Sequence, residues 1–289
     1  MTQLPTRVGV VGCGLMGSGI AEVAARSGRD VTVVESDAVA AERGLARIEA
    51  SLATALSRGK LSEDERDTAL ARIEVTHDAD ALADRELVIE AVVEDEAAKV
   101  AVFERLDKIV LSDDAVLASN TSSIPIMKLA MATRRPESVV GLHFFNPVPV
   151  LPLVELVPSL LTSQETVERA DAFAAKQLKK HTVLSKDRAG FIVNALLIPY
   201  LLAAIRMVES GFASPEDIDT GMVDGCAHPM GPLALTDLIG LDTTMAVAQS
   251  MYAEFKEPLY APPPLLLRMV EAGLLGRKAG RGFFTYQAK

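Results

Sequence analysis

An apolar run that leads directly into three closely spaced glycines constrains this chain more than any other feature of its sequence. The run ends at Val11 and continues as the pattern G-x-G-x-x-G before a predicted helix. Gly12 permits a tight turn, Gly14 lets the backbone approach a pyrophosphate, and Gly17 lets the helix pack close to the strand. The N–H groups at the start of the helix would then face the phosphates. The pattern therefore predicts a dinucleotide-binding domain.

A carboxylate at the end of the second predicted strand indicates which dinucleotide is bound. Glu35 closes an apolar strand 18 residues after Gly17. A carboxylate at this position accepts hydrogen bonds from the ribose hydroxyls and repels the 2′-phosphate of NADP. The next residues, Ser36 and Asp37, offer no positive charge to that phosphate. NAD is therefore the predicted cofactor.

The order of the predicted elements divides the chain into an α/β part and a helical part. Apolar runs alternate with helical patterns up to position 187, which is typical of a doubly wound sheet. Uninterrupted runs such as 87–89 indicate parallel strands buried on both faces. We predict a Rossmann-type NAD-binding domain over residues 1–187 and a small all-α domain over residues 188–289.

Local patterns place the individual elements. Strands are expected at residues 7–11, 31–35, 87–92, 115–119, 139–145, 153–157 and 181–184. Helices are expected at residues 16–27, 38–58, 62–72, 96–111, 164–178, 191–210, 215–225, 232–255 and 264–275. Polar residues interrupt the apolar segment 191–208, so we expect a buried core helix there and not a membrane span.

Composition excludes several classes of partner. The net charge of −10 argues against binding to nucleic acid or to an anionic membrane surface. The two cysteines, Cys13 and Cys226, are too few for a disulfide framework, and no His/Cys cluster has the spacing of a metal site. The sequence shows no signal-peptide pattern, so the expected compartment is the cytoplasm.

A histidine and a glutamate are the strongest candidates for proton transfer. His143 lies near the carboxyl end of a predicted strand, where ligand clefts of doubly wound sheets lie. Its apolar neighbours would hold the imidazole neutral and ready to accept a proton. Glu155 lies in an otherwise apolar strand, where an unpaired carboxylate is costly, and pairing would orient His143. A hydrogen-bonded core histidine and an edge-strand glutamate facing water are the alternatives.

Two further polar features accompany these candidates. The cluster 119–123 follows a predicted strand end, where it either supplies hydroxyl and amide groups to the cleft or caps a helix. Asn194 lies inside the apolar first helix of the second domain, where a buried asparagine needs a hydrogen-bonding partner. A ligand is one such partner.

Together these motifs resemble those of the short-chain L-3-hydroxyacyl-CoA dehydrogenase family, and within it those of the bacterial 3-hydroxybutyryl-CoA dehydrogenases. The matching stretches span essentially the whole chain and are residues 8–12, 92–95, 119–123, 143–147, 190–194, 229–232, 240–242 and 276–283. The resemblance implies an oxidoreductase that interconverts (S)-3-hydroxyacyl-CoA and 3-oxoacyl-CoA by hydride transfer with NAD. It further implies a homodimer formed through the second domain.

The resemblance also implies roles for individual residues. His143 is similar to the catalytic general acid/base and Glu155 to its partner. Ser122 and Asn194 resemble the residues that hold the reacting oxygen and the thioester. The implied cofactor contacts are Gly12, Gly14, Leu15, Met16, Gly17, Glu35, Glu94, Lys99 and Asn120. The implied contacts to the CoA part of the substrate are Ser51, Arg58 and Lys60.

Some features bear on the substrate and leave alternatives open. Residues 42–60 hold four basic and two acidic side chains, which suits the phosphates of CoA but also a solvated helix face. Ala189 and Ala195 stand where many family members have proline and arginine. The alternatives are a dehydrogenase of a hydroxy acid or sugar acid without CoA, and a non-catalytic NAD-binding protein. The set of Ser122, His143, Glu155 and Asn194 speaks against the second alternative, because a binding role needs none of them.

Overall fold

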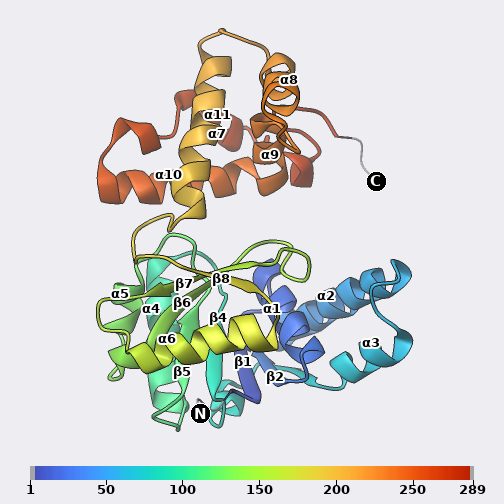
Figure 1. Ribbon diagram of the computed structural model, residues 1–289, viewed down its shortest axis with the longest axis vertical. Helices are drawn as coiled ribbons and strands as arrows, with labels where there is room; N and C mark the ends of the chain where they lie inside the picture. Colours follow the sequence, from blue (N-terminus) through green and yellow to red (C-terminus); the bar gives the residue numbers. More distant parts are fainter. Residues whose placement is uncertain (1–3, 287–289) are drawn as a thin grey trace. The chain divides into compact units, whose positions relative to one another are not determined.

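The computed structural model describes residues 4–286 and contains two compact units. The first unit ends at Arg188 and consists of a sheet with flanking helices, and the second begins at Ala189 and is helical (Figure 1). The predicted fold class, a doubly wound α/β domain followed by a small all-α domain, is confirmed.

The sheet of the first unit has eight strands in the order β3-β2-β1-β4-β5-β6-β7-β8. Their bounds are β1 (Arg7–Val11), β2 (Asp30–Val34), β3 (Ile73–Thr76), β4 (Leu87–Glu90), β5 (Val116–Ser119), β6 (Val139–Phe144), β7 (Leu153–Pro158) and β8 (His181–Leu184). Every neighbouring pair is parallel except β6 and β7. The sequence patterns missed β3, because this edge strand is only partly buried and has no continuous apolar run.

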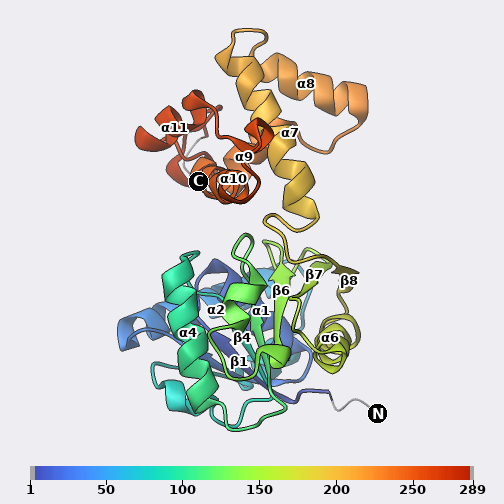
Figure 2. The ribbon, with the colours of Figure 1, turned by 90° about the vertical axis from the view of Figure 1, so that its left-hand side faces the viewer.

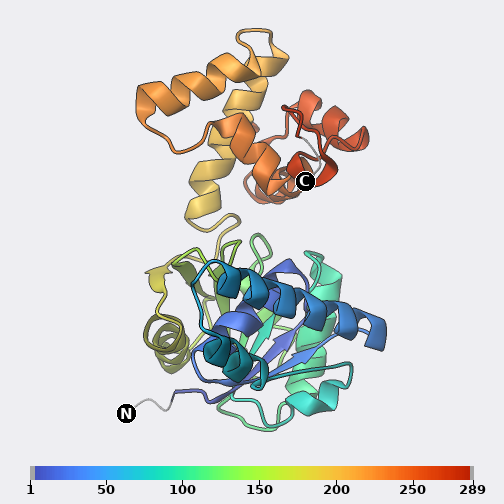
Figure 3. The same ribbon diagram turned by 90° about the vertical axis from the view of Figure 1, so that its right-hand side faces the viewer.

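Helices cover both faces of this sheet. They are α1 (Leu15–Arg26), α2 (Ala38–Ser57), α3 (Glu63–Leu70), α4 (Glu96–Ile109), α5 (Ile126–Ala130) and α6 (Gln164–Asp171). Figure 2 shows α4 and α6 on opposite faces, and Figure 3 shows α2 and α3 as an antiparallel hairpin. The predicted helix 164–178 changes at Ala172 into the π-helical segment η3 (Ala172–Gln177). Short 3₁₀ turns are η1 (Ala79–Leu82) and η2 (Pro136–Ser138).

Side-chain caps begin several of these helices where the sequence has Asp or Ser. Asp37 accepts a hydrogen bond from Ala40 N, and Asp95 accepts one from Ala98 N. Ser62 forms a reciprocal capping box with Glu65. Each cap satisfies backbone N–H groups that have no partner inside the helix.

The second unit contains α7 (Val193–Glu209), α8 (Pro215–Cys226), α9 (Pro232–Ile239), α10 (Leu241–Phe255) and α11 (Pro264–Glu271), with 3₁₀ turns η4 (Pro258–Tyr260) and η5 (Arg277–Ala279). The single helix predicted at 232–255 is two helices, because Gly240 has a φ of 103° that a continuing helix cannot contain. The core of the second unit contains the fully buried side chains of Leu202, Leu233 and Met251. Within residues 4–286 no helix has both the length and the apolar character needed to cross a membrane.

Candidate active site

The glycine loop after β1 has a different steric reason for each glycine. Gly12 has a φ of +91°, which L side chains rarely adopt. A Cβ at Gly17 would overlap the carbonyl oxygen of Gly12, whereas a Cβ at Gly14 would meet no described atom within 4 Å. Leu15 and Met16 begin α1 immediately after this loop. The loop therefore combines a tight turn, a close helix contact and open space for a ligand, which fits a dinucleotide.

Glu35 follows β2 directly and its side chain holds the glycine loop. Its Oε1 accepts a hydrogen bond from Cys13 N at 2.5 Å, and its Oε2 accepts one from Ser36 N at 3.1 Å. Arg47 of α2 donates to the carbonyl oxygen of Cys13 at 2.5 Å. Burial raises the pKa of the Cys13 thiol to about 12, with the Glu35 charge adding to the effect, so this thiol stays protonated.

The antiparallel pairing of β6 with β7 creates the histidine–glutamate pair. His143 lies directly opposite Glu155 in the register, and paired residues of antiparallel strands share one face of the sheet. His143 Nδ1 is 2.7 Å from Glu155 Oε2, and Glu155 is fully buried. The alternative of an edge-strand glutamate facing water is therefore wrong. Because the Glu155 carboxylate contacts Nδ1, Nε2 is the ring nitrogen of His143 that points away from this carboxylate.

Two side contacts fix the surroundings of His143. Its ring centroid lies 4.5 Å from that of Phe145. Asn120 follows β5, and its Oδ1 accepts a hydrogen bond from Phe144 N at 2.9 Å. The loop after β5 and the end of β6 are thus tied together at the carboxyl edge of the sheet.

Glu94 organises the polar loop 119–123. Its Oε1 accepts hydrogen bonds from Thr121 Oγ1 at 2.6 Å and from Ser122 N and Oγ at 2.8 and 3.0 Å. Ser123 N and Oγ donate to the same oxygen at 3.2 and 3.1 Å. Burial alone would raise the pKa of Glu94, but the charge of Lys99 and the hydroxyl and N–H donors outweigh it and lower that pKa. Glu94 therefore stays ionised and fixes Ser122.

Lys99, predicted as a cofactor contact, has its ammonium group inside the protein. The residue is 1% exposed, and its Nζ lies 2.6 Å from Glu90 Oε1 and 3.3 Å from Glu94 Oε2. Sequence reasoning missed Glu90, although one signal was available. Glu90 ends an otherwise apolar strand, as Glu155 interrupts another, and a buried carboxylate there needs a partner.

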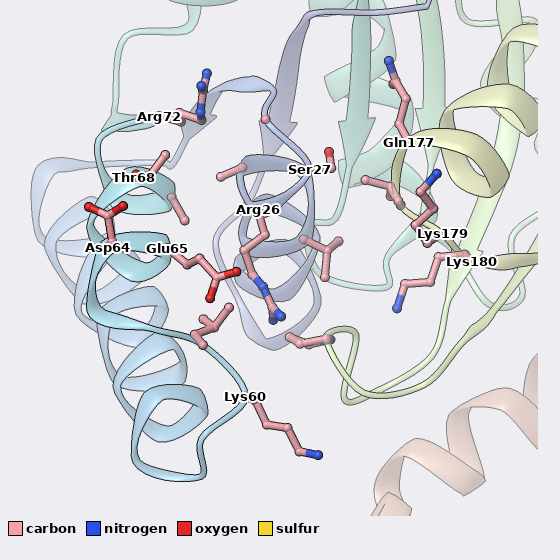
Figure 4. A pocket seen from close by; sticks show the side chains of 17 residues that line it. Arg26, Ser27, Lys60, Asp64, Glu65, Thr68, Arg72, Gln177, Lys179 and Lys180 are labelled. Carbon is pink, nitrogen blue, oxygen red and sulfur yellow. The ribbon is translucent and has the colours of Figure 1, made fainter.

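The predicted CoA residues lie on and after α2. Ser51 Oγ donates to Glu22 Oε2 of α1 at 2.5 Å, while Arg58 and Lys60 are exposed. Lys60 lines a groove of about 640 Å³ between α1, α3 and the segment that follows η3. Figure 4 shows Arg26 in the middle of this groove, with Lys180 on one side and Glu65 on the other. The basic residues that line it are Arg26, Lys60, Arg72, Lys179 and Lys180.

The first unit thus brings together His143 with Glu155, and Ser122 with Glu94 and Lys99. Asn194 belongs to the second unit, where it lies half-buried in the first turn of α7.

Two family models match the chain in succession. Residues 7–188 match the 3-hydroxyacyl-CoA dehydrogenase NAD binding domain, and residues 190–286 match the 3-hydroxyacyl-CoA dehydrogenase C-terminal domain. A 3-hydroxybutyryl-CoA dehydrogenase of Mycobacterium tuberculosis strain H37Rv is 60% identical over 286 residues, which cover 99% of this chain and 100% of that relative.

Two crystal structures show the same fold over the full length. M. tuberculosis FadB2 has a TM-score of 0.98 and 60% identity, and the match covers 99% of this chain and 100% of that one. The (S)-3-hydroxybutyryl-CoA dehydrogenase PaaH1 from Ralstonia eutropha has a TM-score of 0.92 and 45% identity, and the match covers 98% and 100% of the two chains.

Proposed function

Because the chain belongs to the 3-hydroxyacyl-CoA dehydrogenase family, we propose that it interconverts (S)-3-hydroxybutyryl-CoA and acetoacetyl-CoA, with NAD as the cofactor. The observation that carries the proposal is the buried pair of His143 and Glu155 at the carboxyl edge of the sheet. A protein that only binds NAD needs no proton-transfer pair beside its nucleotide site. The glycine loop and Glu35 supply the geometry that the NAD pyrophosphate and ribose require.

The glycine loop and Glu35 would hold NADH, which in the reductive direction would supply the hydride for the ketone carbon of acetoacetyl-CoA. His143 delivers a proton to the oxygen that becomes the hydroxyl, and it accepts that proton in the oxidative direction. The Glu155 carboxylate holds Nδ1–H of the ring and stabilises the imidazolium form. Ser122, kept in place by Glu94, donates a hydrogen bond to the same oxygen. Asn194 is proposed to hold the thioester end.

The function is tested by a steady-state assay with NADH and acetoacetyl-CoA, run beside free acetoacetate. We expect rapid oxidation of NADH with the CoA ester and a much lower kcat/KM with the free acid. Equal values would favour the alternative of a hydroxy-acid dehydrogenase that does not recognise CoA.

Glu35 is expected to set the cofactor preference. NADH should be preferred over NADPH, because the Glu35 carboxylate repels a 2′-phosphate and no basic residue follows it directly. Glu35→Ala should reduce this preference, mainly by weakening the use of NADH. The measurement is the ratio of kcat/KM for the two cofactors at saturating acetoacetyl-CoA. Equal kcat/KM values in the unaltered protein would contradict the assignment.

We propose that the phosphates of CoA bind at the basic groove that Lys60 lines. Five basic and two acidic side chains line the groove, on a protein of net charge −10, so a polyanion finds a local attraction there. Arg58 precedes Lys60 in the exposed turn after α2 and adds to this local charge. Ser51 is proposed to contribute from α2, where its hydroxyl already contacts Glu22.

Removing the two exposed charges tests this placement. Arg58→Ala combined with Lys60→Ala should raise KM for acetoacetyl-CoA several-fold with a smaller change in kcat, as expected for lost uniform binding. The effect should shrink as salt rises, because exposed charges are screened. Arg105→Ala with Lys108→Ala removes the same charge from α4 and serves as the control. An unchanged KM at low salt in the test variant would place the CoA phosphates elsewhere.

We propose that two chains pair through the helical unit. Several large apolar side chains of this unit are exposed, including Leu196 at 74% and Phe212 at 77%. A small domain buries only a limited fraction of its own apolar surface, and identical chains associate most often as symmetric dimers. Light scattering at micromolar concentration should give the mass of a dimer, and a monomeric mass would contradict it.

The cytoplasmic location stays a prediction.

A further inference from the structure

A buried carboxylate outside the proposed catalytic set lies beneath the loop that carries Ser122. Glu90 is the last residue of β4 and is fully buried. Its Oε1 accepts hydrogen bonds from Lys99 Nζ at 2.6 Å and from Val92 N at 2.7 Å. Its Oε2 accepts a hydrogen bond from Ser119 Oγ at 2.6 Å. None of these contacts of Glu90 involves Ser122, so any influence of Glu90 on that residue is indirect.

One route from Glu90 to Ser122 passes through two charged groups. The Lys99 ammonium lies between the two carboxylates, 2.6 Å from Glu90 Oε1 and 3.3 Å from Glu94 Oε2. Glu94 then accepts hydrogen bonds from both the backbone N–H and the hydroxyl of Ser122. Through the Lys99 ammonium, Glu90 is therefore linked to the carboxylate that accepts hydrogen bonds from Ser122.

A second route passes through neutral groups. A carboxylate only accepts hydrogen bonds, so Ser119 must donate its hydroxyl proton to Glu90. The Ser119 oxygen then accepts a hydrogen bond from Thr121 N at 3.1 Å. Thr121 Oγ1 in turn accepts from Ser123 N and Ile124 N at 3.2 and 2.9 Å. Through the Ser119 hydroxyl, Glu90 is therefore also linked to Thr121, near the start of the loop 119–123.

Stability alone is a weak explanation for this arrangement. Desolvating two charges is costly, and buried ion pairs are often no more stabilising than apolar residues of the same size. We propose that Glu90 is a positioning residue that fixes Ser122 for contact with the reacting oxygen of the substrate. This inference rests on the proposed function, since it requires Ser122 to contact that oxygen.

The test variant is Glu90→Gln, which keeps the size of the side chain and removes its charge. The Gln oxygen can still accept from Lys99 and Val92, and its amide group can donate to the Ser119 hydroxyl. We expect kcat for acetoacetyl-CoA to fall on the order of 10-fold to 100-fold, because small displacements of catalytic groups have effects of this size. The Kd for NADH should change much less. Thermal unfolding shows whether the variant is folded at the assay temperature.

A double-mutant cycle separates positioning from general damage. In a Ser122→Ala background, Glu90→Gln should reduce kcat only about twofold or less, because the group that it positions is gone. Ser119→Ala interrupts the neutral route alone, and it should give a smaller loss that also disappears in that background. Should Glu90→Gln fail to fold, the Ser119→Ala cycle decides the question.

Glu86→Gln is the matched control. Glu86 immediately precedes β4 and its carboxylate accepts hydrogen bonds from Thr6 N and Arg7 N at 2.6 and 3.0 Å, at the other end of the strand. The small effect of Glu86→Gln on kcat should be the same in the unaltered protein and in the Ser122→Ala background. Equal fold losses for Glu90→Gln in the two backgrounds, or wild-type kcat in either Glu90→Gln or Ser122→Ala, would overturn the inference. Failure of the unaltered protein to reduce acetoacetyl-CoA would instead overturn the proposed function.

Discussion

His143→Ala is expected to lower kcat for acetoacetyl-CoA reduction on the order of 10²- to 10⁴-fold, the contribution of a positioned general acid/base. Reduction of the ketone needs a proton at the oxygen, and in the variant water must supply it without orientation. The Kd for NADH should stay close to that of the unaltered protein, because the glycine loop and Glu35 follow β1 and β2, whereas His143 lies on β6. Stopped-flow oxidation of NADH and a fluorescence titration measure the two quantities.

Glu155→Gln extends this prediction to the partner of the histidine. The amide keeps the size of the side chain but cannot stabilise an imidazolium by charge, so kcat should fall, though less than in His143→Ala. The double variant should be no slower than His143→Ala, since residues that act as one unit give non-additive losses. Retained turnover in His143→Ala would show that another group carries the proton. Multiplying losses in the double variant would show that Glu155 acts independently of His143.

Gly17→Ala should impair both NADH binding and stability, whereas Gly14→Ala should impair binding alone. A Cβ at Gly17 would overlap the Gly12 carbonyl oxygen, so the loop and α1 must separate. Overpacking of this kind costs about 1–3 kcal/mol. A Cβ at Gly14 meets no described atom within 4 Å, and the residue has an ordinary φ of −66°.

The two glycine variants control for each other. Both add one methyl group to the same loop, so the difference between them comes from what that methyl group meets. In Gly14→Ala the Kd for NADH should rise about tenfold or more, since a steric cost of 1.4 kcal/mol already gives that factor. Its thermal unfolding temperature should match that of the unaltered protein. Unchanged NADH binding in Gly14→Ala would place the pyrophosphate away from this loop.

Local patterns in the sequence predict the fold class and the proposed cofactor site. The dinucleotide motif depends on residues that are close in the sequence. It needs a glycine with a positive φ, a glycine where the helix packs close to the strand, and a carboxylate after the next strand. The spacing of these residues therefore predicts the site. The break at Gly240 is also local, but a glycine inside a helical pattern does not reveal its φ. The sequence patterns did not predict edge strand β3, because a partly buried strand has no continuous apolar run.

Tertiary structure decided how the proposed proton-transfer residues, His143 and Glu155, and the loop that carries Ser122 are held. The sequence gives a lone glutamate in an apolar strand, but only the antiparallel reversal at β7 and its register place Glu155 opposite His143. Likewise, Glu90, Lys99 and Ser119 lie on three separate elements, and their hydrogen bonds exist only after β4, β5 and α4 have packed. Periodicity reports what each segment buries, whereas register and packing between distant segments determine which buried polar groups meet.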